Sequence, residues 1–342
     1  MPIRSCPGGF RFIPAAMLVA LLLSGASAAV PDPAKVGGPE SCAECHIQEI
    51  EAWKLSVHFK TFNTMPQRPE TAAMLGKLGL GAMKKQQQCM DCHFLNREID
   101  QKIQPTSGVA CESCHGAGRD WAQTHGDYGK GFTKATESAA HRSARVAQAL
   151  AAGMSTPANI YAHGSACYGC HLMNDEKIVN VGGHSPSSAG FNLLTWSQGE
   201  VRHTMLHTDN TSNPEATPAR RRQLFVVGVI LETEFGFRAV ARATENAKFG
   251  VTLARQTDTA RKLLEKIQAL APTPELAAII NVAAATKLRL NNAAELNQAA
   301  DKLAALGREF AAKVTGEQLA GIDALVPDAT QYRGKPYPLG AP

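Results

Sequence analysis

The sequence predicts a mainly α-helical fold in two parts, with short helices and loops over residues 41–213 and a helical bundle segment over residues 214–326. Three observations predict it. Signals for β-strands are nearly absent, and apolar residues recur at helical spacing after Pro218. Cysteine and histidine are confined to the part before Pro218. The two parts are therefore expected to do different things.

The first 28 residues are typical of a secretory signal peptide. Arg4 and Arg11 supply positive charge, residues 13–23 form an uncharged apolar run, and residues 26–28 read Ala-Ser-Ala. The run is too short to cross a hydrocarbon core, which needs about 20 residues. We therefore expect export to the periplasm, cleavage near Ala28 and no transmembrane segment in the mature chain. A retained membrane anchor is the alternative.

A Pro- and Gly-containing linker, residues 29–40, leads into four repeats of one short motif. In each motif two cysteines are separated by two residues, and a histidine follows the second cysteine directly. The motifs are Cys42, Cys45 and His46; Cys89, Cys92 and His93; Cys111, Cys114 and His115; and Cys167, Cys170 and His171.

This motif is the attachment signature of haem c. Two thiols add to the two vinyl groups at one edge of the porphyrin, and the spacing lets one turn of chain span them. The next residue then lies under the ring, where its imidazole ligates iron as the proximal ligand. The sequence therefore predicts four covalently bound haems.

Two other uses of paired cysteines are less consistent with the pattern. A zinc site needs two cysteine pairs, or a Cys/His set, for each metal ion, and no histidine need follow every pair. Disulfides form in exported proteins, but a disulfide inside each C-x-x-C pair would be strained. Neither alternative accounts for four histidines in the same place.

Seven further histidines are available as sixth ligands of the iron. The candidates for distal ligation are His58, His125, His163, His184 and His203. His207 is four residues from His203, so only one of the two is expected to ligate. His141, beside Arg142, is expected to be solvated. Methionine is the rival ligand type and would raise the reduction potential; those available are Met65, Met74, Met83, Met154 and Met205.

The position of His58 suggests which centre it serves. Residues 44–59 are expected to form one helix, in which the 12 residues from His46 to His58 would span about 18 Å. Both residues could not then ligate one iron, so His58 should serve a neighbouring haem. Residues 61–88, with Pro66 and Pro69, are expected to be a loop-rich excursion.

Residues 41–210 are too few to build an ordinary protein core around four haems. The haems are therefore expected to form the core, wrapped by short helices and loops and followed by the C-terminal helical segment.

Three apolar stripes predict three or four helices in that segment, with a turn at residues 272–274 and a Pro-rich tail over residues 327–342. The stripes are Leu224, Val227, Leu231 and Phe235; Leu263, Ile267 and Leu270; and Leu296, Ala299, Leu303, Leu306, Phe310 and Val314. These helices either cover the haem core or form a homo-oligomer or partner-docking module. The basic run at residues 220–222 either is solvated or pairs with haem propionates or an acidic partner.

Two sequence elements carry a family resemblance. One is the first motif followed by Trp53, Ser56 and His58 in the pattern W-x-x-S-x-H. The other is residues 108–116 followed by His125. The arrangement resembles the cytochrome c-554-like family of tetrahaem and larger multihaem cytochromes. The resemblance implies that His58 is a distal ligand and that haems pack in close, nearly parallel or perpendicular pairs. One family member relays electrons from hydroxylamine oxidation, and one haem in that family is five-coordinate.

Two functions are compatible with these observations. The first is an electron carrier between respiratory redox proteins, with every iron six-coordinate. The second is an enzyme that acts on a small nitrogen or sulfur compound at one five-coordinate haem, because an open position permits substrate chemistry. The supply of histidines favours the carrier. A haem-based sensor or a structural subunit of a respiratory complex is a weaker alternative. Nucleic-acid binding has no supporting motif.

Overall fold

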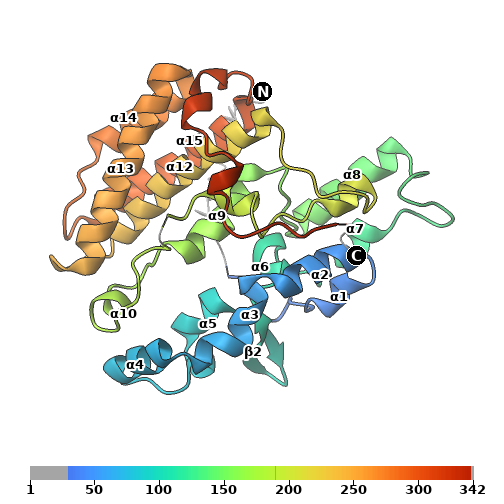
Figure 1. Ribbon diagram of the computed structural model, residues 1–342, viewed down its shortest axis with the longest axis horizontal. Helices are drawn as coiled ribbons and strands as arrows, with labels where there is room; N and C mark the ends of the chain where they lie inside the picture. The colour runs from blue at the N-terminus through green and yellow to red at the C-terminus, as the bar shows by residue number, and fades with distance from the viewer. Residues whose placement is uncertain (1–29, 189, 340–342) are drawn as a thin grey trace, which may run out of the picture.

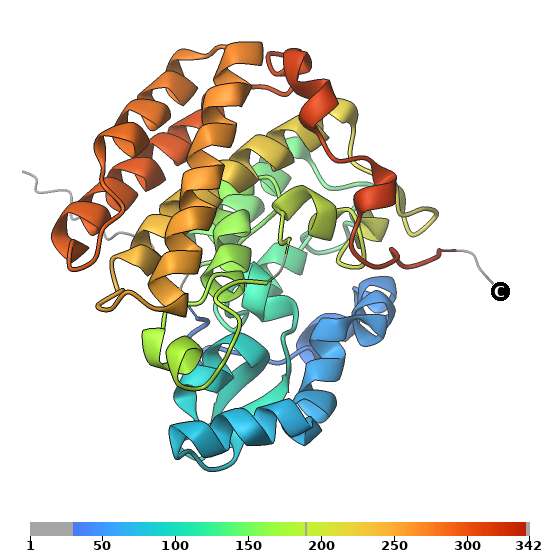
Figure 2. The same ribbon diagram turned by 60° about the vertical axis from the view of Figure 1, so that its left-hand side comes forward.

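The computed structural model describes residues 30–188 and 190–339, so the expected signal peptide lies outside the described residues. The fold is mainly helical, as the sequence predicts, and the described residues also form one two-stranded sheet. Four long helices, α12 to α15, gather on one side, and the short helices of the first 200 residues spread below and beside them (Figure 1). The second view shows the long helices lying alongside one another (Figure 2).

Short helices and one hairpin make up the part that carries the four motifs. They are α1 (Glu40–Ala43), α2 (Ile47–Leu55), α3 (Val57–Thr64), α4 (Pro69–Leu78), α5 (Gln87–His93), β1 (Phe94–Ile99), β2 (Lys102–Gly108), α6 (Cys111–His115), α7 (Ala122–Gly126), α8 (Ala139–Ala151), α9 (Ile160–His171), α10 (Glu176–Asn180) and α11 (Leu193–Ser197). Short 3-10 turns η1 (Met65–Gln67), η2 (Met83–Lys85) and η3 (Met205–Thr208) complete the set.

The single helix expected over residues 44–59 is wrong, because the chain breaks at Ser56. Ser56 is extended, with φ −71° and ψ 160°, and its hydroxyl accepts a hydrogen bond from the amide of Phe59 at 3.2 Å. It therefore ends α2 and caps α3. His58 lies in the first turn of this new helix.

The loop-rich excursion expected over residues 61–88 is also wrong. Pro69 stands at the first position of α4, where its fixed φ suits a helix start. Gly79, with φ 67°, ends the helix in the left-handed conformation. The two prolines that suggested loops thus lie in a 3-10 turn and at a helix start.

The hairpin of β1 and β2 was not expected from the sequence. Its turn is formed by Asp100 and Gln101, both with positive φ of 49° and 59°. Two-residue hairpin turns of this kind usually contain glycine, and this turn contains none. Pro105 inside β2 further weakens the strand signal.

The C-terminal segment contains α12 (Pro218–Val240), α13 (Lys248–Leu270), α14 (Pro274–Ala285) and α15 (Ala293–Lys313), followed by 3-10 turns η4 (Ala320–Leu325) and η5 (Ala329–Gln331). Thr273, in the predicted turn, caps α14 by accepting from the amide of Leu276 at 3.2 Å. Helix α12 is buried on most of its surface because α9, α11, α13 and α15 all pack against it.

The first and third predicted stripes point into the core, and Leu306 of the third is partly buried. The second stripe is displaced. Of its three members, Ile267 is buried as expected, Leu263 is partly buried and Leu270 is 45% exposed. The buried face of α13 is completed by Leu253, Ala260 and Leu264. Two stripes on one helix that differ by one residue have nearly the same spacing. Periodicity alone therefore did not distinguish the predicted stripe from the one that is buried.

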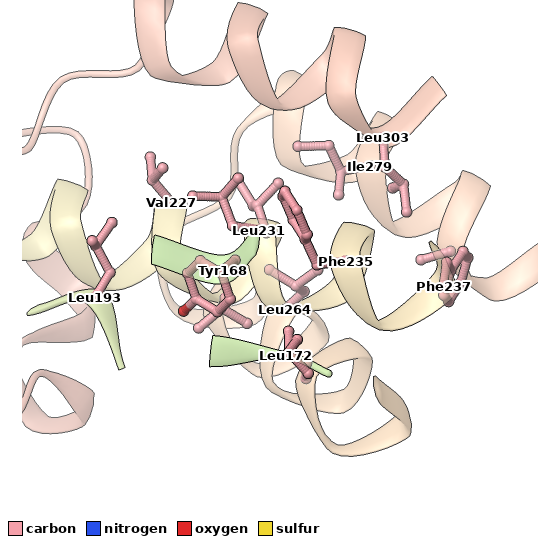
Figure 3. Packing of buried hydrophobic residues seen from close by; sticks show 14 of the residues in the cluster. Tyr168, Leu172, Leu193, Val227, Leu231, Phe235, Phe237, Leu264, Ile279 and Leu303 are labelled. Carbon is pink, nitrogen blue, oxygen red and sulfur yellow. The ribbon is translucent and has the colours of Figure 1, made fainter. Parts of the chain in front are cut away.

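The main hydrophobic core begins at Ile160 and ends near Val326, and it joins α9 to the C-terminal helices. Figure 3 shows Tyr168 and Leu172 of the α9 region packed among side chains of α12 and α13. The region from residue 30 to residue 126 has only two small clusters, with three buried hydrophobic residues in each. The expectation that haems rather than side chains form the core was made for residues 41–210. The thin packing of residues 30–126 is consistent with it, whereas residues 160–194 belong to the main protein core.

The segments expected as a linker and a tail both pack against the rest of the chain. In the linker, Val36 is fully buried, and the Pro33 carbonyl accepts from the amide of Glu98. In the tail, Arg333 accepts from the amide of Glu200 at 2.8 Å. Among residues 30–188 and 190–339, no helix is both long and apolar enough to span a membrane.

The basic run pairs with the chain's own groups. Arg221 pairs with Glu215 at 2.8 Å and Arg222 with Asp323 at 2.6 Å, while Arg220 donates to the carbonyl of Pro157. The first two pairs stabilise the start of α12, where unpaired cations are unfavourable.

Candidate cofactor-binding centres

Helical turns present the four cysteine motifs. The second, third and fourth motifs lie in α5, α6 and the last turn of α9, and the first spans α1 and the start of α2. Residues three and four apart share a helix face, so in the three motifs that are helical throughout the first cysteine shares a face with the second cysteine and with the histidine. All eight motif cysteines are free thiols, with no disulfide among them.

Each motif histidine faces one histidine from elsewhere in the chain. The ring centres are 6.0 Å apart for His46 and His125, 6.2 Å for His93 and His184, 6.2 Å for His115 and His203, and 6.3 Å for His171 and His58. Imidazole nitrogens bind metal ions at about 2 Å, so two rings on opposite sides of one ion have centres about 6 Å apart. All four pairs have this spacing.

The four partner histidines come from four separate segments. His58 lies in α3, His125 in α7, His184 in the loop after α10, and His203 just before η3. Contacts to the backbone carbonyl of His58 hold that residue in place. The hydroxyl of Thr61 donates to the carbonyls of His58 and His93. A side chain on Gly108 would meet the carbonyl of His58 at 2.1 Å, so glycine is required where β2 packs against α3.

The Nδ1 atoms of five paired histidines are held by hydrogen bonds. Those of His125, His184, His203 and His115 donate to the carbonyls of Ala122, Ser185, Val201 and Ser155 over 2.5–3.0 Å. The fifth, that of His171, bonds the hydroxyl of Ser188 at 2.7 Å. Such bonds orient the ring and leave Nε2 for a metal ion, as in most histidine ligands. For His46, the nearest carboxylate oxygen belongs to Glu49, at 3.8 Å.

His163 lies beside the third centre but in a different position. Its ring centre is 5.1 Å from that of His115, and its Nδ1 is 3.3 Å from the hydroxyl of Ser155. The Nδ1 of His115 bonds the carbonyl of the same serine. His163 therefore lies on the Nδ1 side of His115, away from Nε2. As the partner of His115, His203 fits better than the candidate His163.

The two histidines considered weaker lie outside the pairs. His207 is exposed in η3. His141 is 45% exposed, as expected, and its Nδ1 lies 2.7 Å from the carboxylate of Glu137, whose side chain is fully buried. That carboxylate also takes two 2.7 Å hydrogen bonds from Arg145, which in turn donates to the carbonyl of His125. No sequence pattern indicated this support behind α7.

Burial favours the neutral form of several paired imidazoles. It lowers the pKa of His58 and His115, and it lowers the pKa of His93 and His171 to about 4. A neutral imidazole is the form that ligates a metal ion. Burial also raises the pKa of the Cys114 thiol to about 11 and that of the Cys167 thiol to about 12.

Thiols from different motifs lie next to one another. Cys42 interacts with Cys111, and Cys92 with Cys170, closely enough to shift each other's pKa. Cys114 is near Cys167, where α6 contacts α9. A cavity of about 430 Å³ is bordered by Cys92 and Cys170. The centres therefore form a series in the order first, third, fourth and second.

Unpartnered buried polar atoms gather at these centres. In the described part of the chain they include Oε2 of Glu49 beside His46, Nε1 of Trp121 beside His125, Nε1 of Trp196 beside His171, and Nε of Arg202 next to His203. A buried polar atom without a partner costs about 1–3 kcal/mol. The ring spacing and the free thiols of the motifs fit bound haem, and these unpartnered atoms add to that fit at the first, third and fourth centres.

Aromatic packing around His171 was not foreseen. The ring of Phe191 stacks on His171, with centres 4.1 Å apart and 14° between the planes, and Trp196 lies 5.3 Å away. Phe191 and Trp196 follow the fourth motif by 20 residues or more, so no spacing rule connected them to it.

A buried glutamate inside the third motif holds the N-terminal segment. Glu112 is 1% exposed, and its carboxylate accepts from the amides of Gly37, Gly38 and Gly118 over 2.6–2.8 Å. This anchors the residues before the first motif against the third, which adjoins it.

Comparison with known proteins gives a partial match at the motif-bearing end. Residues 41–116 match the model of the family described as cytochrome c554 and c-prime. Cytochrome c-554 of Nitrosomonas europaea is 31% identical over 121 residues, which is 33% of this chain and 51% of that protein. The match thus spans about half the length of this relative. No solved structure matches the chain. The resemblance expected from the sequence is confirmed over the matched region.

Proposed function

We propose, from the place of residues 41–116 in the cytochrome c554 family, that the protein is a periplasmic tetrahaem c-type cytochrome which transfers electrons between redox partner proteins. One observation carries the proposal. Each of the four motif histidines faces a second histidine at the spacing that two axial ligands of one iron require. Bound haem supplies one-electron redox chemistry, and ligands on both sides of the iron leave no position for substrate.

The ligand pairs we propose are His46 with His125 for the first haem, His93 with His184 for the second, His115 with His203 for the third, and His171 with His58 for the fourth. The eight motif cysteines would hold the four haems through thioether bonds. In this scheme the protein positions each imidazole, burial favours the neutral form of the more buried rings, and hydrogen bonds at Nδ1 orient five of the eight.

The order of the centres suggests how electrons pass through the molecule. The neighbouring thiols support a series with the first and second haems at its two ends and the third and fourth in the middle. We therefore propose that the donor and the acceptor dock near the first and second centres. Those partners are proteins of the exported space, since the expected signal peptide directs the chain there.

Three measurements on the mature protein test the proposal. The pyridine haemochrome assay should give four haems per chain that survive acid-acetone extraction. Electron paramagnetic resonance of the oxidised form should show low-spin iron, and the reduced form should not bind carbon monoxide rapidly. Two or fewer haems would contradict the cofactor count. A dominant high-spin signal with stoichiometric carbon monoxide binding would favour the alternative, an enzyme acting on a small nitrogen or sulfur compound.

A variant makes the test quantitative. His184→Ala removes one proposed ligand from a loop, outside every helix. It should create one high-spin haem and one carbon monoxide site per chain, which shows that the assay detects a single open iron. His207→Ala, at an exposed histidine outside the pairs, is the matched control and should leave both signals unchanged.

A further inference from the structure

The three tryptophans of the chain divide into two groups by the hydrogen bonding of the indole N–H. Trp53 donates to the carbonyl of Val109 at 2.8 Å. The Nε1 atoms of Trp121 and Trp196 are also buried, yet neither has a hydrogen-bond partner among the described residues. An indole N–H is a donor only, so each of these two sites calls for an acceptor that the protein does not supply.

Both unpartnered indoles lie against a proposed ligand. The ring of Trp121 meets that of His125 edge to face, with centres 5.3 Å apart and planes at 83°. The ring of Trp196 lies 5.3 Å from that of His171, at 53°. Trp121 stands at the start of α7 and is 7% exposed, while Trp196 belongs to α11. Two unrelated elements therefore place the same donor at two centres.

The chemistry of haem identifies the acceptor. Its vinyl edge is consumed by the thioether bonds, and its remaining polar substituents are two propionate carboxylates. An ionised carboxylate accepts hydrogen bonds and donates none, which complements an indole N–H. Hydrogen bonds to a charged acceptor are also stronger than neutral ones.

We infer that the indole N–H of Trp121 binds a propionate of the first haem and that of Trp196 binds a propionate of the fourth. The inference rests on the proposed function and adds binding residues to it. Each bond stabilises the ionised carboxylate and offsets part of its negative charge. The protein therefore uses these two indoles to raise the potential of two haems relative to that of the same haems without the donor.

Infrared spectroscopy of haem labelled with ¹³C at the propionate carboxyls tests the inference. Trp121→Phe and Trp196→Phe keep an aromatic ring and remove only the donor. Each should shift one labelled carboxylate band, the two variants should shift different bands, and the double variant should shift both. The reduction potential of the affected haem should fall. The pH range in which that potential varies should shift upwards, because the propionate pKa rises when the donor is removed.

Trp53→Phe is the matched control, since it loses a bond to the protein's own carbonyl and should leave all labelled bands in place. Unchanged bands in both test variants, or equal shifts in the control, would overturn the inference and indicate water or another acceptor. Four low-spin haems in the same samples would show that only this inference had failed, and not the proposed function.

A measurement on the unmodified sequence covers the case in which a variant does not mature. With ¹⁵N in the indoles and ¹³C in the propionates, dipolar-coupling solid-state NMR reports their separation. A hydrogen bond places an indole nitrogen within about 4 Å of a carboxyl carbon. We expect two such couplings, and the absence of both overturns the inference.

Discussion

The imidazoles of His58 and His171 face each other with ring centres 6.3 Å apart, one from the first turn of α3 and the other from the end of α9. Helix α9 packs against α12 and α15 in the main core. The fourth centre therefore connects the N-terminal helices to the C-terminal ones. Replacing either imidazole should act on this centre first.

His58→Met should change one haem and leave three nearly unchanged. A thioether ligand raises the potential relative to a second imidazole, so the fourth haem should become easier to reduce. Potentiometric titration with electron paramagnetic resonance resolves the individual haems. His207→Met, at an exposed site outside the pairs, is the control. A change spread evenly over all four haems would argue against the pairing with His171.

His203 and His163 provide a direct choice for the third haem. His203→Ala should produce one high-spin haem, because it removes the ring that faces His115 at 6.2 Å. His163→Ala should keep four low-spin haems, because that ring lies on the Nδ1 side of His115. The reverse outcome would make His163 the ligand.

Acid should weaken the support behind His125 in a defined pH window. The hydrogen bonds of Arg145, together with those of His141, lower the pKa of the Glu137 carboxyl from 4.5 to about 2. A depressed folded-state pKa means that the contribution to stability is complete above about pH 4.5 and is lost as the pH falls towards 2. Glu137→Gln should flatten that part of the stability–pH curve measured by chemical denaturation. The exposed Glu70→Gln variant should keep the wild-type slope, and an unchanged slope in Glu137→Gln would disprove the assignment.

Gly307→Ala should destabilise the protein by about 1–3 kcal/mol. Its new methyl group would lie 2.2 Å from the ring of Tyr161, a residue of α9 that is 1% exposed where α9 packs against α15. Gly76→Ala in α4 is the matched control. It has open space around it and should stabilise by about 0.5–1 kcal/mol through helix propensity. Thermal denaturation compares the two, and equal effects would contradict the close packing of α15 on Tyr161.

Protein made without haem-attachment machinery should fold only in part. The region from residue 30 to residue 126 has two clusters of three buried hydrophobic residues, whereas α12 to α15 share one continuous core. Circular dichroism should retain the signal of the long helices, and limited proteolysis should cut first before residue 126. A protease-resistant motif region in the apoprotein would show that the haem contribution is smaller than we infer.

The sequence predicted the motif residues and the helical C-terminal part because both follow local rules. The cysteine spacing is a chemical requirement, and the stripe from Leu296 to Val314 repeats at the helical period. The pairs of histidines could not be predicted in the same way. Which imidazole faces His115 depends on where a loop near residue 203 lies relative to α6, and that is a tertiary relationship.

The failures have identifiable physical causes. Ser56 caps a helix inside a stretch that otherwise favours a continuous helix, and one hydroxyl decided the outcome. Asp100 and Gln101 make a hairpin turn with positive φ without glycine. Glu137 and Arg145 form a buried pair although they are eight residues apart in the sequence. Local sequence signals were weak at all three places, because contacts with other parts of the chain offset the cost of the local backbone conformation.

Helix α9 ends in the fourth motif, and its earlier turns are embedded among α12 and α15. Protein interiors of this kind are close-packed and have low compressibility. Tyr168, between the two cysteines of that motif, is 1% exposed and in contact with Phe191 and Phe235. The imidazole of His171 is thus attached to a close-packed support. If His171 ligates iron as proposed, this stiff support would keep the reorganisation energy small, and the C-terminal helices would then contribute to the rate of electron transfer without contacting the haem.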